Sequence, residues 1–249
     1  MSRRHHFRDH LPLTPRQEDH FRWRGKEVSR IEGFSDAVFA FAVTLLVVAL
    51  EVPNTFDGLM NVIRGFPAFI ASFTLLMLFW NSHYKFFRRY GLDDTFVRWV
   101  NYGILMMVLC SVYPLKFVFS ALFSSIFGGG ELGAHIETVS QAGTIFRYYG
   151  LGFVCIWSLF VLLHWHALRQ AGELRLTSAE IVMTRATLAE YLIFIAVCEL
   201  SICLTFTPVS PAVCGFVYII LGPLLAWNGT WHGRQVAAIT ARHPEPRDA

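Results

Sequence analysis

The amino-acid sequence predicts an all-α, polytopic membrane protein with six transmembrane helices and both termini in the cytoplasm. Of its 249 residues, 54% are hydrophobic and 16% are charged, and its mean hydropathy is +0.45. This composition is too apolar for an ordinary soluble domain. The apolar residues gather into six runs, and the basic residues gather between alternate runs. Both patterns are typical of helices that cross a membrane.

The first expected helix lies within residues 30–53, which read RIEGFSDAVFAFAVTLLVVALEVP. Residues 37–50 contain no charged side chain. With its apolar flanks, this run approaches the roughly 20 residues that cross a bilayer core of about 30 Å as a helix. We therefore expect a transmembrane helix that carries a polar pair, Ser35 and Asp36, near its beginning.

The remaining apolar runs predict five further helices. We expect them at residues 66–84, 96–119, 148–168, 183–206 and 209–231. Pro114 falls near the end of the third helix, where a kink costs little. The expected connections are a polar loop at 54–64, a charged one at 85–98, a long one at 128–146 and a tight turn at 207–211.

The basic residues indicate how these spans are oriented. Of the 21 lysines and arginines, 18 lie on one side of the six-span arrangement, and only Arg64, Lys116 and Arg147 lie on the other. By the positive-inside rule, the richer side is cytoplasmic and holds both termini. The expected divisions are a hydrated basic cytoplasmic arm at residues 1–29, a six-helix transmembrane domain at 30–231 and a cytoplasmic tail at 232–249.

The first helix has two different faces when its side chains are placed at about 100° per residue. Ser35 then lies about 120° and Asp36 about 220° from Phe41. A carboxylate in a membrane helix usually turns to a protein partner or to water. We therefore expect Asp36 to bond to neighbouring helices and to leave the opposite face for lipid, another helix or a pore. This face, the Phe41 stripe, consists of the residues within about 60° of Phe41: Phe34, Ala37, Val38, Phe41, Thr44, Leu45, Val48 and Val52.

Residues of the first three helices resemble a known family. The motif R-x-x-x-F-S-D is followed by A-V-F-A-F-A-V-T-L-L in the first helix, and W-x-x-H follows in the second. The matching positions are Arg30, Phe34, Ser35, Asp36, Trp80, His83, Asn101 and Pro114. In this order they resemble the transmembrane protein 175 family, the endolysosomal potassium channel and its bacterial homologues. The resemblance covers the chain from about Arg30 to Pro114.

The resemblance implies a potassium-permeable cation channel of the bacterial plasma membrane, with potassium as the permeant ion and no cofactor. The first helix of each subunit of a homotetramer would line the pore, and residues 30–231 would be the channel domain. The pore and constriction positions of the family fall on Phe41, Thr44, Leu45 and Val48. Phe41 departs from the branched aliphatic residue of the family. Three consequences are open: a tighter gate, a cation–π contact with the ion, or a conductance and selectivity that differ from those of the family. The inter-helix polar network of the family falls on Arg30, Phe34, Ser35, Asp36, Trp80, His83 and Asn101.

The remaining polar residues indicate no catalytic or metal site, so we expect no enzyme. The five cysteines lie in apolar runs without C-x-x-C spacing and are expected as buried thiols. Glu190 and Glu199 fall on opposite faces of the fifth helix; Glu199 is expected to bond to a neighbouring helix or to attract cations. His164 and His166 project in different directions and lack the i, i+4 spacing of a zinc site. The net charge of +3 gives no support for a nucleic-acid partner.

Two functional classes remain open on the sequence. A channel would have to select ions without a ring of backbone carbonyls, because no T-V-G-Y-G filter occurs. The alternative is a secondary transporter of a small cation or solute. Such a protein is expected to have discontinuous helices and polar groups at the membrane midplane, and the sequence shows few of either.

Overall fold

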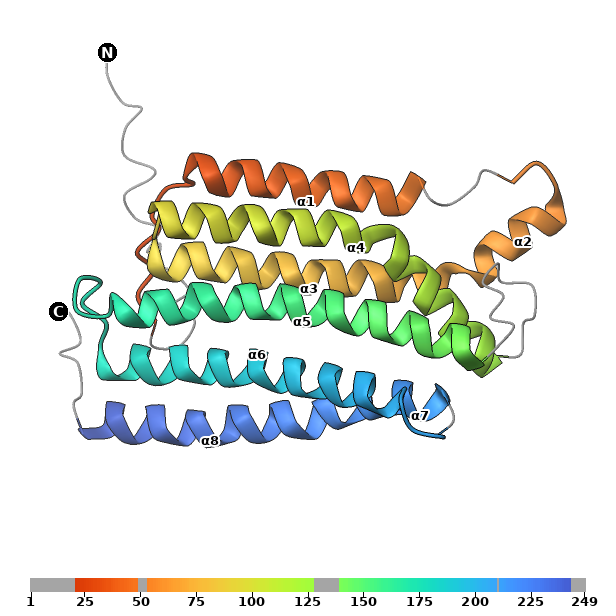
Figure 1. The fold of residues 1–249 in the computed structure, drawn as a ribbon. Helices are drawn as coiled ribbons and strands as arrows, with labels where there is room; N and C mark the ends of the chain where they lie inside the picture. The colour runs from red at the N-terminus through yellow and green to blue at the C-terminus, as the bar shows by residue number, and fades with distance from the viewer. Residues whose placement is uncertain (1–20, 49–52, 128–138, 210, 243–249) are drawn as a thin grey trace, which may run out of the picture.

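The computed structural model describes residues 21–48, 53–127, 139–209 and 211–242, and these form a bundle of helices (Figure 1). The elements are α1 (Arg30–Val48), α2 (Phe56–Arg64), α3 (Phe66–Tyr90), α4 (Thr95–Phe127), α5 (Val139–Arg169), α6 (Ser178–Leu204), α7 (Pro211–Phe216), the 3₁₀ helix η1 (Val217–Ile220) and α8 (Leu221–Arg242). In this part of the chain five helices are long and apolar enough to cross a membrane, and the bent pair of α2 and α3 makes a sixth. The expected all-α, multi-pass fold is confirmed.

The long helices lie side by side in an order that leaves α1 and α8 at the two edges of the bundle (Figure 1). α1 packs against α3 and α4, while α6 packs against α5 and α8. α1 begins and α8 ends at the same end of the bundle. This arrangement is what an even number of spans requires.

Aromatic side chains join the middle helices. The ring of Trp157 on α5 stacks on the ring of Phe194 on α6, with 4.5 Å between centroids. Phe79 on α3 meets Trp157 edge-on at 5.2 Å. Stacked and edge-to-face pairs of this kind stabilise packing beyond the area that they bury. They make α3, α5 and α6 a common core against which the outer helices lie.

The helices extend past the apolar runs, so two predicted connections are wrong in part. α3 continues to Tyr90 and α4 begins at Thr95, which makes most of residues 85–98 helical. Lysine and arginine are good helix formers and suit the last turn of a helix. Gly91, with a φ of 62°, then ends α3. α5 begins at Val139, within the expected loop 128–146, of which residues 128–138 lie outside the described part of the chain.

The polar loop expected at residues 54–64 is instead the amphipathic helix α2. The side chain of Thr55 caps it by accepting a hydrogen bond from the Gly58 N–H at 3.1 Å. α2 meets α3 at a bend of 42°. Its apolar residues Phe56, Leu59 and Ile63 are exposed and recur at helical spacing. That spacing, interrupted by polar side chains, is the signal that could have predicted this helix.

The sixth expected span, residues 209–231, is present as one apolar helical segment, Val213–Ala241, that contains a short 3₁₀ stretch. α7 ends at Phe216, η1 follows, and α8 then runs to Arg242, well into the predicted tail. Pro223 has no N–H to donate to the carbonyl of Ile219, which lies in η1, so a regular α-helix cannot continue through this point. Ser201 on α6 donates its hydroxyl to the Cys214 carbonyl at 2.8 Å and fixes α7.

Candidate pore helix and its supporting network

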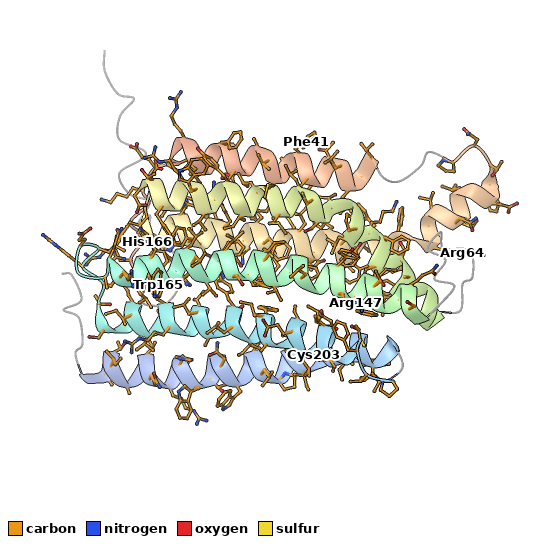
Figure 2. The ribbon with its side chains drawn as sticks, viewed as in Figure 1. Phe41, Arg64, Arg147, Trp165, His166 and Cys203 are labelled. Atoms are coloured by element: carbon orange, nitrogen blue, oxygen red, sulfur yellow. The ribbon has the colours of Figure 1, made fainter. Side chains whose placement is uncertain are left out.

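The two faces predicted for α1 are present in the structure. Phe39 is 2% exposed and belongs to the core, whereas Phe41 is 56% exposed. Figure 2 shows Phe41 on the side of α1 that faces away from the other helices. The buried face consists of Ile31, Glu32, Ser35, Phe39, Ala42 and Leu46.

The Phe41 stripe is mostly exposed. Phe34, Ala37, Phe41, Thr44 and Val48 have exposed side chains, while Val38 and Leu45 are half-buried. Leu45 packs against the core and therefore lies at the edge of the predicted pore-facing set rather than in its centre. Val52 lies outside the described residues. Thr44 donates its hydroxyl to the Ala40 carbonyl at 3.0 Å, which leaves the lone pairs of its oxygen free to accept.

Asp36 is held by α3. The indole Nε1–H of Trp80 donates to Asp36 Oδ1 at 2.9 Å. Trp80 is itself stacked on Tyr84, with 5.6 Å between ring centroids. A carboxylate near the start of a membrane helix thus has a neutral donor from the neighbouring helix, as its position away from the Phe41 stripe predicted.

Ser35 is held by α4. Asn101 donates its Nδ2–H to Ser35 Oγ at 2.9 Å, and Ser35 donates its own hydroxyl to the Ile31 carbonyl at 2.7 Å. The carbonyl oxygen of Asn101 then faces His83 Nε2 at 2.7 Å, so the network requires the proton of the imidazole to be on Nε2. Ser35, His83 and Asn101 are all fully buried. Three helices are therefore joined by one chain of hydrogen bonds.

Arg30 and Phe34, which were predicted within this network, lie elsewhere. Both are exposed, and Phe34 is 57% exposed. Arg30 is eleven residues from Phe41, which places it about 20° away around the helix, on the exposed side. The network in the structure consists of Ser35, Asp36, Trp80, His83 and Asn101.

Other polar and sulfur-bearing residues lie apart from this network. His164 is buried, with Nδ1 3.0 Å from the Phe160 carbonyl, whereas His166 bonds to Asp94. Glu199 is exposed on α6 rather than bonded within the bundle core, and Glu190 is half-buried. Two of the cysteines expected to be buried, Cys110 and Cys203, are exposed, and all five are free thiols.

Sequence reasoning missed the contacts between distant residues at the end of the bundle where α1 begins. Arg24 binds Glu180 at 2.7 Å and Phe21 packs into the core of the bundle, whereas residues 26–28 are exposed. His166 on α5, labelled in Figure 2, hydrogen-bonds to Asp94, with 2.7 Å between Nε2 and Oδ2. Residues 1–20 lie outside the described part of the chain.

Asp94 also caps α4. Its Oδ1 accepts the N–H groups of Phe96 and Val97 at 2.8 and 3.0 Å. Partial burial raises the pKa of Asp94, but hydrogen bonds from His166 and the Val97 N–H outweigh this effect. The pKa of Asp94 therefore lies below its ordinary value.

Comparison with known proteins places this geometry in a family. The family model "Endosomal/lysosomal potassium channel TMEM175" matches residues 30–114, the part that contains the whole network. A potassium channel of Marivirga tractuosa is 35% identical over 218 residues, which cover 82% of this chain and 87% of the relative. The chain belongs to the TMEM175 family.

Solved structures extend the likeness beyond the matched segment. A crystal structure of a variant of the potassium channel MtTMEM175, in complex with a nanobody fusion protein, is 32% identical with a TM-score of 0.74. It covers 87% of this chain and 98% of that chain. The TMEM175 homologue of Chamaesiphon minutus, described as a lysosomal potassium-selective channel homologue, is 24% identical with a TM-score of 0.56 and shares the fold. The likeness in fold therefore extends well beyond residues 30–114.

Proposed function

We propose that this TMEM175 protein is a potassium-permeable cation channel and that the α1 helices of several subunits line its pore. The observation that carries the proposal is the division of α1 into two faces. Its back is bonded to α3 and α4 through Asp36 and Ser35. Its front, the Phe41 stripe, is exposed at the edge of the chain. The Marivirga tractuosa relative is named a potassium channel, which supplies the ion.

The pore would form between subunits. α1 lies at the edge of the bundle, so its front can face only lipid or other copies of the chain. A closed ring of identical subunits is the usual way to place the same helix repeatedly around one axis. We propose a homotetramer in a bacterial plasma membrane, in which four Phe41 stripes face one another.

Phe41 would form the constriction. Its ring is the largest side chain in the middle of the Phe41 stripe, and apolar constrictions close a pore by excluding water. Its face could also attract a cation. Thr44 follows one turn further along. The lone pairs of its hydroxyl oxygen are free to coordinate a potassium ion that has lost part of its water shell. Val48 continues the apolar lining. Leu45 would line only the border of the pore, because part of its side chain packs into the core.

The alternative, a secondary transporter, has one observation in its favour. The last span changes from α-helix to 3₁₀ helix and back at η1, and irregular helices occur in transporters. This irregular stretch, however, lies near the end of the bundle where α6 and α7 meet, and Ser201 beside it is already bonded to Cys214.

Flux through purified protein in liposomes separates the two functions. A channel passes potassium down its own gradient and needs no gradient of a second ion. Its flux keeps rising over a wide range of potassium concentration. A transporter requires a coupled ion or shows exchange of labelled substrate at equilibrium. Passive potassium flux that exceeds sodium flux supports the channel, and flux that depends on a proton or sodium gradient would contradict it.

A further inference from the structure

Residues 21–25, here called the strap, cross the end of the bundle at which α1 begins. Phe21 at the start of the strap is fully buried. Its ring meets the ring of Tyr90 edge-on, with 5.6 Å between centroids, and the guanidinium of Arg89 lies 5.0 Å from the centroid of Phe21. An edge-on aromatic pair with a cation over the ring anchors the strap to the last turns of α3.

The backbone of the strap is bonded to the same turns. The N–H groups of Arg24 and Gly25 both donate to the Arg88 carbonyl at 3.1 Å, and Arg88 Nη1 donates back to the Gly25 carbonyl at 3.0 Å. This approach requires glycine, because a Cβ on Gly25 would lie 2.5 Å from the carbonyl oxygen of Phe87. These backbone bonds and the close contact at Gly25 fix the position of the strap on α3.

Glu180, in the first turn of α6, holds the other side of the strap. Its Oε2 accepts from Arg24 Nη2 at 2.7 Å, and its Oε1 accepts from Arg24 Nη1 at 3.0 Å and from the Arg22 N–H at 2.9 Å. The carboxylate also completes a capping box with Thr177. The Glu180 side chain is 1% exposed. A buried carboxylate with this many donors makes strong, directional bonds.

The strap is connected directly to α1. Only residues 26–29 separate Gly25 from the first residue of α1. Ser29 Oγ accepts the Glu32 N–H at 3.2 Å and caps the helix, and the Glu32 carboxylate lies 3.3 Å from Arg88 Nε. Arg88 thus contacts both the strap and the first turn of α1. Arg88 therefore links the strap to this turn.

We propose that Glu180 is a positioning residue for the pore helix: through Arg24 it holds the strap between α3 and α6, and the strap fixes where α1 begins against α3. This inference rests on the proposed function, in which α1 lines the pore. The strap precedes the residues that match the family model, which begin at 30. Glu180 lies on a helix that does not belong to the proposed pore.

The expected direction follows from the apolar front of α1. Across a narrow pore, facing apolar side chains attract one another as water leaves. The strap binds α1 to the body of its own subunit and opposes that collapse. Loss of the Glu180 bonds should therefore narrow the pore and lower the flux.

The test compares two identical changes in the full-length protein. Glu180→Gln removes the charge that holds Arg24, and Glu173→Gln makes the same change at an exposed position in the connection between α5 and α6. Amide hydrogen exchange of residues 21–33 and potassium flux per reconstituted protein are measured for both. We expect faster exchange and a loss of flux of at least about fivefold for Glu180→Gln, the lower end of the usual coupling between sites. Glu173→Gln should leave both unchanged.

A merely structural role would lower the yield or the thermal midpoint and leave the flux per folded protein unchanged. Unchanged exchange in Glu180→Gln, or faster exchange with unchanged or higher flux, overturns the proposal. If Glu180→Gln does not fold, Gly25→Ala displaces the strap without leaving an unpaired buried charge, and the same loss of flux is expected. A wild-type protein without potassium flux would contradict the proposed function, whereas exchange in residues 26–33 would still report whether Glu180 positions α1.

Discussion

Trp80 on α3 donates its indole N–H to Asp36 on α1 at 2.9 Å, and the next residue back, Ser35, accepts a hydrogen bond from Asn101 on α4. Two adjacent side chains thus attach α1 to two different helices. Both hydrogen bonds are made by side chains on the face of α1 opposite Phe41. The polar pair fixes the rotation of α1 about its axis and leaves the Phe41 stripe free.

Replacement of Trp80 should cost stability more than it changes ion preference. Trp80→Ala removes the donor to Asp36 and the stacked contact with Tyr84, and an acceptor left without its donor costs about 1–3 kcal/mol. Trp99→Ala is the matched control, because Trp99 on α4 is 71% exposed. The thermal midpoint of each purified variant and its potassium-to-sodium flux ratio are measured. A Trp80→Ala protein with a wild-type midpoint and a reversed flux ratio would show that Trp80 acts on the ion path rather than on packing.

The hydrogen bonds of Asp94 predict a stability difference that depends on pH. Because the pKa of Asp94 is lowered in the folded protein, its contribution is present above the unfolded pKa, about 3.9, and is lost as the pH falls through the folded value. Asp94→Asn keeps a side chain that can cap α4. It should lower the thermal midpoint at pH 7, and the difference from wild type should shrink below about pH 4.

Asp93→Asn is the control for this effect. Asp93 lies next to Asp94 but is half exposed and pairs with the exposed Arg98 at 3.4 Å. Exposed ion pairs of this kind contribute little to the free energy of unfolding. A constant difference between wild type and Asp94→Asn from pH 7 to pH 3 would contradict the titration of Asp94.

The orientation of the bundle is a further prediction. The excess of basic residues on one side predicts that both termini lie in the cytoplasm. A phosphatase that is active only outside the cytoplasm should be inactive when fused after Ala249 and active when inserted at Gly129. Activity after Ala249 but not at Gly129 would show that the topology is the inverse of the predicted one. Activity at both sites would contradict an even number of spans.

The helical period of the sequence sufficed to predict the two faces of α1, because Phe39 and Phe41 differ by about 200° and the structure buries one and exposes the other. It could not predict where the helices end. The apolar run of α3 stops near Tyr84, but the helix continues until the left-handed Gly91. The capping residues determine where a helix ends, and the thickness of the membrane determines how long its apolar run is. Hydropathy indicates only the length of the apolar run.

The strap could not be predicted because its partners are distant in sequence. Arg24 and Glu180 are 156 residues apart, and neither stands in an unusual local pattern. Basic residues before a first membrane span usually indicate topology alone. The capping motif of Thr177 and Glu180 was visible in the sequence, but nothing local showed that Arg24 would share the same carboxylate.

The central claim, that the Phe41 stripe faces the pore, is tested most directly by two substitutions measured in one liposome preparation. Phe41→Ala should widen an apolar constriction, so that cation flux rises and the preference for potassium over sodium weakens. Phe39→Ala removes a ring that is 2% exposed and lies 5.6 Å from the ring of His83, so it should lower the thermal midpoint without opening the pore. Unchanged flux in Phe41→Ala together with raised flux in Phe39→Ala would contradict the assignment of the pore-facing side of α1.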